Sequence, residues 1–119
     1  MRQLDDPTKL KAVKFTSPAA EKPKQITWLA RTDRLVCAVQ TVTKGGETNL
    51  HSHTHLDGFW FVLKGRARFY SGLTEVMAEL GPHEGVLVPR GVKYWFESVG
   101  EEPLDLMQVE CSDTPMRTR

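Results

Sequence analysis

The sequence predicts a single all-β domain, folded as a sandwich or a barrel. Short runs of apolar and β-branched residues follow one another along the chain, and Gly, Pro and polar turn signals separate them. No stretch keeps a helical apolar period for about three turns without meeting Gly or Pro. Such short, regularly punctuated strands are typical of sandwiches and barrels. At 119 residues the chain suits one core and is too short to divide comfortably into two.

At least eight strands are expected. The first lies around Ile26–Leu29, and the others occupy Leu35–Val42, Phe59–Leu63, Ala67–Tyr70, Thr74–Leu80, Gly85–Val88, Val92–Ser98 and Leu104–Cys111. Residues 1–24 contain three prolines and no sustained apolar period, so we expect a loosely ordered arm there. The domain itself is expected over residues 25–111, and a polar tail over residues 112–119.

Charge and composition exclude several classes of partner. With 16 Lys and Arg against 15 Asp and Glu, the chain lacks a basic footprint for nucleic acid or an anionic membrane surface. No apolar run approaches the roughly 20 residues that a membrane span needs, and the first residues lack a secretory apolar segment. We therefore expect a cytoplasmic protein that binds a small molecule or another copy of itself. In that reducing compartment, Cys37 and Cys111 are expected to be buried free thiols.

Two histidines stand two positions apart, just before the apolar run Phe59–Leu63. Alternate residues of an extended chain share a face, so His51 and His53 point the same way, with β-carbons about 7 Å apart. Two imidazoles can tilt across that span onto one ion, as iron, zinc, nickel and manganese sites require. A solvated loop between strands is the alternative. His55 shares the face but lies about another 7 Å along, so it reaches the same ion only if the chain bends.

The segment around these histidines resembles the first motif of the cupin superfamily, which runs Gly, five residues, His-x-His, three or four residues, Glu, six residues, Gly. Gly45, His51, His53 and Gly65 match that motif, whereas Gly58 stands at the glutamate position. The resemblance implies a cupin jelly-roll β-barrel, also called a double-stranded β-helix, with a small-molecule site in its lumen. Cupins are often dimeric, so it also implies a homodimer.

A second cupin motif runs Gly, five residues, Pro-x-Gly, two residues, His, three residues, Asn. Residues 89–91 match its Pro-x-Gly, while His83 takes the place of the leading glycine, Tyr94 that of the histidine and Ser98 that of the asparagine. Two of the usual four metal ligands of the family are therefore replaced. The metal, if one is bound, is expected on His51 and His53.

Asp57 and Tyr94 are the candidates to complete the site. Asp57 stands one place before the missing glutamate, and either swings inward to give a two-histidine, one-carboxylate metal set or serves as a turn residue before Gly58. Strand alternation places Val92, Tyr94 and Phe96 on the inner face. A buried phenol needs a hydrogen-bond partner, so Tyr94 is expected to ligate a hard ion, to donate to a substrate oxygen or to act as a catalytic acid or base.

Three further residues are candidates to contact a bound ligand. Trp60 and Val62 are expected to face the lumen from the strand Phe59–Leu63, whose other side is also apolar. Gln40 and Gln108 interrupt apolar runs, so they either face solvent or supply amide contacts to a ligand. Because the second apolar side of Phe59–Leu63 must be covered by the arm or by another subunit, we expect a homodimer.

Three functions fit these features. The first is a metal-containing cupin enzyme, an oxygenase, lyase or isomerase acting on a small organic substrate. The second is a metal-free cupin, similar to epimerases or cyclases of the superfamily, in which His51, His53 and Tyr94 act as acids and bases. The third is a binding module without turnover, because a fold does not imply an activity.

Overall fold

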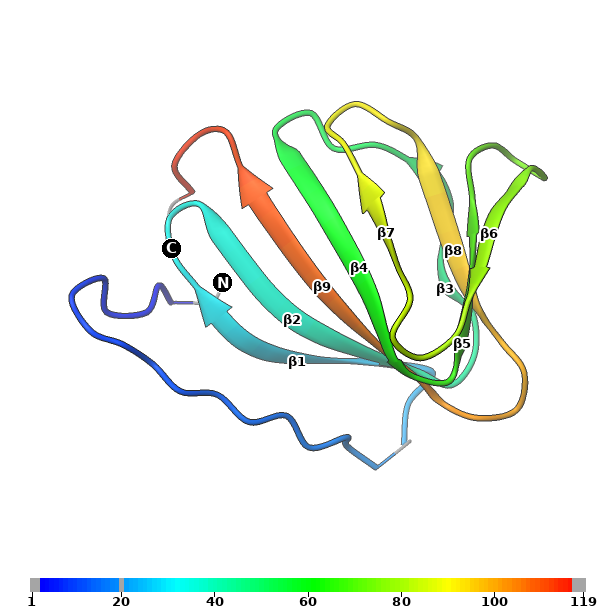
Figure 1. The fold of residues 1–119 in the computed structure, drawn as a ribbon, viewed down its shortest axis with the longest axis horizontal. Coiled ribbons are helices and arrows are strands. Elements are labelled where there is room, and N and C mark those ends of the chain that lie inside the picture. The colour runs from blue at the N-terminus through cyan, green and yellow to red at the C-terminus, as the bar shows by residue number, and fades with distance from the viewer. Residues whose placement is uncertain (1–2, 20, 117–119) are drawn as a thin grey trace.

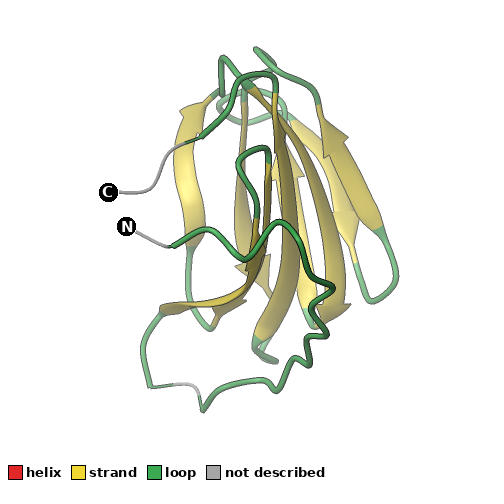
Figure 2. Ribbon diagram, turned by 90° about the vertical axis from the view of Figure 1, so that its left-hand side faces the viewer, coloured by secondary structure: helices red, strands yellow, loops and turns green. Residues whose placement is uncertain are grey.

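The computed structural model of the protein describes residues 3–19 and 21–116, which form nine strands and no helix. The strands are β1 (Lys24–Arg31), β2 (Leu35–Val42), β3 (Gly46–His51), β4 (Leu56–Lys64), β5 (Arg66–Tyr70), β6 (Val76–Leu80), β7 (Gly85–Val88), β8 (Tyr94–Val99) and β9 (Leu104–Ser112). They form a five-stranded sheet in the order β1-β2-β9-β4-β7 and a four-stranded sheet in the order β3-β8-β5-β6. The two sheets face each other (Figures 1 and 2), and we call the region between their inner faces, which side chains fill, the lumen.

The all-β prediction is confirmed, and one strand was missed. Leu35–Val42 and Gly85–Val88 form strands with the predicted bounds, whereas no strand was predicted at Gly46–His51. That segment reads Gly-Glu-Thr-Asn-Leu-His, which lacks an apolar alternation. Its pairing with β8 is irregular, because the register shifts between the pairs Glu47↔Phe96 and His51↔Tyr94. Val92, expected on the inner face, precedes β8 and is 47% exposed, so that expectation was wrong.

The lumen changes character along its length. From the start of β9 its lumen-facing residues are Leu104, Leu106, Gln108 and Glu110, which pair in register with lumen-facing residues of β2 and β4. Apolar side chains from both sheets fill the first end as one core cluster, which includes Val42, Trp60, Val62, Phe69, Phe96, Leu104 and Leu106. The other end carries the polar residues. Strand alternation selects the face, and the sequence along each strand then decides which end of the lumen is dry.

The turn between β4 and β5 holds the apolar end closed. Gly65 has a φ of +81°, a conformation that other residues rarely adopt, and a β-carbon there would lie 2.6 Å from the carbonyl oxygen of Pro103. The motif glycine at this position therefore has a steric reason, since the start of β9 packs directly against the turn.

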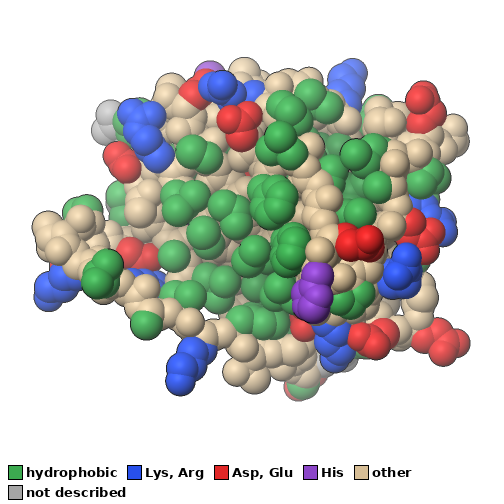
Figure 3. All heavy atoms as spheres, viewed as in Figure 1, with side chains coloured by type: hydrophobic (Ala, Val, Ile, Leu, Met, Phe, Trp, Pro, Cys, Tyr) green, Lys and Arg blue, Asp and Glu red, His purple; other side chains and the backbone are tan. Residues whose placement is uncertain are grey.

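The outer face of the five-stranded sheet exposes apolar side chains on β4 and β7, although Thr41 and Asp105 on the same side are polar and buried. Phe59 and Leu87 are 41% and 63% exposed, and Figure 3 shows hydrophobic side chains gathered over this face. The arm does not cover Phe59; its described hydrogen bonds to the sheet join Asp5 to the backbone of Arg31 at the end of β1 and Pro23 to the end of β2. Leu10 of the arm is fully exposed.

The structure also bears on the two cysteines and on the expectation that the chain has no membrane span. Cys37 and Cys111 are free thiols as predicted, but Cys37 is only half-buried and Cys111 is exposed, since both lie on the outer side of their strands. Within the described ranges there is no helix long and apolar enough to cross a membrane. Residues 1–2 and 20 of the predicted arm and residues 117–119 of the predicted tail lie outside the described residues.

Candidate lumen site

The structure brings His51, His53 and Tyr94 together at the polar end of the lumen. His51 is the last residue of β3, and His53 lies in the loop that follows it. The ring centroids are 5.3 Å apart for the two histidines, 4.5 Å for His51 and Tyr94, and 6.1 Å for His53 and Tyr94. The shift in register between β3 and β8 sets His51 directly opposite Tyr94. The predicted common direction of the two histidines therefore holds, although only one of them lies within a strand.

His51 is held between two oxygen atoms. Its Nδ1 lies 2.5 Å from the carbonyl oxygen of Asn49, and its Nε2 lies 3.3 Å from Oε1 of Glu47. A carbonyl oxygen only accepts hydrogen bonds, so Nδ1 carries a proton. A bare Nε2 and a carboxylate would then face each other as two acceptors. A protonated imidazole would instead form an ion pair with Glu47 at this distance.

A buried glutamine and a lysine fix Glu47. Gln40 donates from Nε2 to Oε2 of Glu47 at 2.8 Å and to Oε1 of Gln108 at 3.0 Å. Lys24 of β1 adds a contact of 3.6 Å between Nζ and Oε2. Gln40 is 1% exposed, so the expectation that it faces solvent was wrong, and its Oε1 finds no hydrogen-bond partner among the described residues. The amide pair lies inside the lumen and orients the carboxylate that faces His51.

His53 contacts a phenol and a second carboxyl group. Its Nε2 lies 3.3 Å from the hydroxyl of Tyr94 and 3.8 Å from Oε2 of Glu110. Burial raises the pKa of Tyr94 well above its usual value, and the nearby carboxylates of Glu47 and Glu110 raise it further. Burial also raises the pKa of Glu110, against an opposing effect of His53. Both shifts favour the neutral forms, which are hydrogen-bond donors.

Trp60 forms the boundary between this cluster and the apolar end. It is 1% exposed, and its ring centroid lies 6.0 Å from that of Tyr94 and 5.3 Å from that of Phe96. Its predicted lumen-facing position is therefore confirmed. Its Nε1 has no partner among the described residues and lies 3.4 Å from where a β-carbon of Gly58 would stand.

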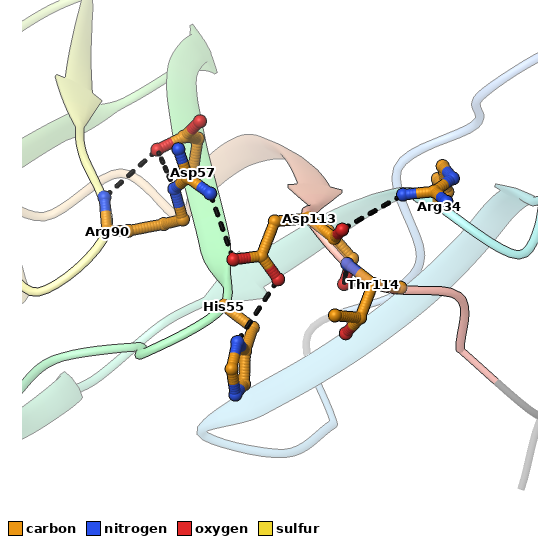
Figure 4. A network of polar contacts seen from close by, with 7 residues as sticks. Arg34, His55, Asp57, Arg90, Asp113 and Thr114 are labelled. Atoms are coloured by element: carbon orange, nitrogen blue, oxygen red, sulfur yellow. Dashed lines mark hydrogen bonds and ion pairs between the residues drawn. The ribbon is translucent and has the colours of Figure 1, made fainter.

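Asp57 and His55 belong to a different network. Oδ1 of Asp57 accepts the backbone N–H of Arg90 at 3.0 Å and also contacts its guanidinium group at 3.4 Å. Asp113 pairs with Arg90 at 2.9 Å and with His55 at 3.1 Å (Figure 4). The structure thus does not bring Asp57 to His51 and His53, because its carboxylate is engaged with the loop before β8. The turn interpretation of Asp57 describes this geometry better.

Two functional candidates, Glu47 and Glu110, escaped the sequence reasoning. Glu110 stands directly opposite Gly58 in the pairing of β4 with β9, so a carboxylate enters the lumen from β9 beside the position where the motif places its glutamate on β4. Strand alternation from Leu104 and Leu106 was the available signal for it. Glu47 lies an even number of residues before His51, which could have indicated a shared face, but the irregular pairing of β3 hides that relation.

The donor types at this end suit a metal ion, whereas their placement does not. Two imidazoles and two carboxyl groups lie near one another, yet no three described His, Cys, Asp or Glu side chains are arranged to hold an ion together. The Nε2 atoms of His51 and His53 face Glu47 and Tyr94, which occupy the coordinating positions themselves. The residues present therefore do not fit the metal set that the motif implies.

A family model described as the cupin domain matches residues 38–110, which is more than half of the chain. The chain belongs to the cupin family. The matched region contains Gln40, Glu47, both lumen histidines, Tyr94 and Glu110. No curated protein sequence matches the chain.

Solved structures similar to this cupin support the fold. A protein from Bacillus halodurans has a TM-score of 0.67 and 24% identity, over 82% of this chain and 78% of the other. A double-stranded β-helix protein from Klebsiella pneumoniae has a TM-score of 0.70 and 20% identity, over 86% and 91% of the two chains. KdgF from Halomonas has a TM-score of 0.65 and 18% identity, over 90% and 88%. At these identities the likeness concerns the double-stranded β-helix fold alone.

Proposed function

We propose that this cupin is a small-molecule enzyme that moves protons with its own side chains, without a resident metal ion. The observation that carries the proposal is the distance of 3.3 Å between Nε2 of His51 and Oε1 of Glu47, which places an imidazole and a carboxyl group within ion-pair distance. A second acid/base pair, His53 with Tyr94, lies beside it. Enzymes that transfer protons commonly use neighbouring acid and base side chains of this kind.

The geometry suggests a role for each group. We assign His53 as the base, because its Nε2 becomes free when a substrate displaces the Tyr94 hydroxyl. Tyr94 and Glu110, whose neutral forms burial favours, would donate hydrogen bonds to a carbonyl oxygen of the substrate. On an α-hydroxy carbonyl substrate, His53 would remove the proton from the hydroxyl-bearing carbon while Tyr94 or Glu110 protonates the carbonyl oxygen, which gives an enediol. His53 would then return its proton to the former carbonyl carbon, and the second hydroxyl would give its proton back to Tyr94 or Glu110 as it becomes the new carbonyl. The reaction class is therefore isomerisation of a small carbonyl compound, with atoms and charge conserved.

Access to the cluster supports a small substrate. The side chains of His51 and His53 remain 29% and 36% exposed, whereas that of Glu110 is 11% exposed. A ligand can thus reach the imidazoles from solvent and place one oxygen deeper, near Glu110. Gln40 and Gln108 lie at the same end and hold Glu47 in place.

Proton exchange tests this proposal without knowledge of the natural substrate. Chelator-treated protein is incubated in D₂O with a panel of small ketones and oxo acids, and NMR follows exchange of the protons next to the carbonyl group. We expect exchange above the protein-free rate for members of the panel, with a loss of about 10²-fold or more in His53→Gln. His55→Gln is the matched control, because His55 lies outside the cluster. Absence of exchange throughout the panel would favour the binding-module function, and full activity in His53→Gln would refute the assigned base.

We further propose that two copies pair through the outer face of the five-stranded sheet. Five strands about 4.8 Å apart and about eight residues long give a face of roughly 500 Å². A stable interface needs roughly 800 Å² per partner, so the exposed arm, with Leu10 and Val13, would supply the rest. Light scattering should give a dimer mass, and Phe59→Asp a monomer, whereas the exposed control Leu73→Asp should remain dimeric. A monomer mass for the unaltered protein at micromolar concentration would contradict the pairing.

The cytoplasmic location stays a prediction.

A further inference from the structure

A second concave surface lies where the two sheets fail to meet. β7 is the last strand of the five-stranded sheet and β6 the last strand of the four-stranded sheet. Between them is a cavity of about 90 Å³, which we call the slot. Its lining residues come from the facing edges of both sheets and from the loop before β8: Phe69, Tyr70, Ser71, Met77, Val86, Leu87, Val88, Val92, Lys93 and Tyr94.

The lining of the slot is apolar and partly open to solvent. Met77, Leu87 and Val92 are 56%, 63% and 47% exposed, so three large apolar side chains gather around one opening. Isolated exposed apolar residues are ordinary, but several around a concavity favour a binding site for an apolar group. The slot is smaller than the roughly 150 Å³ cavity that accepts benzene in another protein, so it suits a branched alkyl group.

One charge accompanies this apolar lining. Lys93 is the only charged residue among the described residues that line the slot, and no acidic side chain within the described ranges pairs with it. An ammonium group at the rim of an apolar cavity complements an anion attached to a hydrocarbon group. The back of the slot is Tyr94, whose ring also contacts His51 in the lumen cluster.

We propose that the slot binds a small branched-chain carboxylate, with its alkyl end against Met77, Val88 and Val92 and its carboxylate beside Lys93. The binding does not depend on the acid/base chemistry proposed above, because the slot offers only apolar contacts and one cation. Tyr94 joins the two surfaces, so a ligand in the slot rests against the residue that donates to the lumen.

Isovalerate, isovaleramide and acetate are suitable probes for the full-length protein. Titration of each probe, followed by the backbone amide signals in NMR, should show saturable shifts of Val86 to Val88 and Lys93 with isovalerate. The dissociation constant is expected to be on the order of millimolar for a ligand of this size. Isovaleramide lacks the charge and acetate lacks the alkyl group, so both should bind more weakly.

Two exposed substitutions separate the contributions. Lys93→Gln should weaken isovalerate by about two- to fivefold and leave isovaleramide unchanged, while Lys44→Gln removes the same charge elsewhere and should change neither. Val92→Ser should weaken both probes by about fourfold per lost methyl contact, whereas Leu73→Ser should not. Shifts centred on His51 and His53 with no effect of Lys93→Gln would overturn the proposal, as would the absence of saturable shifts in the slot.

Discussion

The two ends of the lumen are built from the same strands and differ in almost every physical property. On β9 the first lumen-facing pair is Leu104 and Leu106, both 0% exposed, and the next pair is Gln108 and Glu110. On β8, Phe96 lies within the apolar cluster, whereas Tyr94, two residues earlier, joins that cluster with its ring and contacts His53 with its hydroxyl. One end has stacked aromatic rings, and the other has imidazoles, carboxyl groups and amides that contact one another.

This difference shows how one barrel supports both stability and chemistry. The apolar end removes side chains from water and supplies the free energy of folding. The polar end lowers the free energy of unfolding, because Glu110 and Tyr94 are buried where their charged forms are disfavoured. Changes at the first end should therefore act on stability, and changes at the second on protonation and ligand binding. The predictions below test that division, from the largest effect to the smallest.

Phe96→Ala should produce the largest loss of stability. Phe96 is 0% exposed and its ring lies 5.2 Å from Phe69 and 5.3 Å from Trp60, so truncation leaves a cavity inside the stacked cluster. The free energy of unfolding should fall by about 3–5 kcal/mol in urea denaturation. Phe59→Ala on the open sheet face is the control and should cost much less in the monomer. Equal losses for the two variants would contradict the assignment of the core.

Gln40→Leu should disturb the polar end more than it destabilises the fold. The change removes the donor to Glu47 and to Gln108 and leaves their oxygen atoms with fewer partners. A loss of about 1 kcal/mol in the free energy of unfolding is expected, since the unpartnered Oε1 of Gln40 disappears too. The NMR signals of the His51 ring should also shift, because Glu47 loses its anchor. An unchanged His51 ring would mean that the amide does not orient the carboxylate.

Glu110→Gln should remove the loss of folding stability that Glu110 causes as the pH rises. The folded protein has a raised pKa at Glu110, so it binds a proton more readily there than the unfolded chain does. The contribution of this group to stability therefore falls as pH rises from its usual value near 4.5 through the raised folded pKa. Glutamine mimics the neutral acid, so the stability of the unaltered protein relative to Glu110→Gln should decline across that range in thermal unfolding. An increase with pH would reverse the assigned sign.

Asp57→Asn should have the smallest effect. The ion pair of Asp57 with Arg90 has side chains 48% and 45% exposed, and solvent screens such pairs strongly. The free energy of unfolding should change by about 0.5 kcal/mol or less, and the NMR signals of His51 and His53 should stay in place. A large change in either histidine would return Asp57 to the candidate site.

Much of the fold could be predicted because alternate residues of a β-strand point to opposite faces of the sheet. Leu35–Val42 and Gly85–Val88 are apolar runs with clear turns on either side, and the lumen position of Trp60 follows from the same alternation. The histidine pair and Tyr94 were found by spacing and by their positions in the motif. What alternation cannot supply is register between strands distant in the sequence.

The register between paired strands explains why Glu47 and Glu110 were not predicted. Glu110 matters because it lies opposite Gly58, and Glu47 because an irregular pairing of β3 with β8 aims it at His51. Neither relation is visible in one strand alone. Asp57 shows the opposite case. Its place next to a motif position made a metal role one of two alternatives, but the fold brings Arg90 close enough for its backbone N–H to bind the Asp57 carboxylate.

The most direct test of the central claim is the metal content of protein purified without chelator or affinity resin, measured together with the ¹⁵N NMR signals of its histidine rings. The account predicts far less than one ion per chain, with Nδ1 of His51 protonated and a proton shared between its Nε2 and Glu47. It also predicts that Glu47→Gln, which removes the carboxylate, changes the Nε2 signal of His51 and leaves the metal content as low as before. One firmly bound ion per chain that disappears in His51→Ala would contradict the account, because the ion would then occupy the place assigned to the proton.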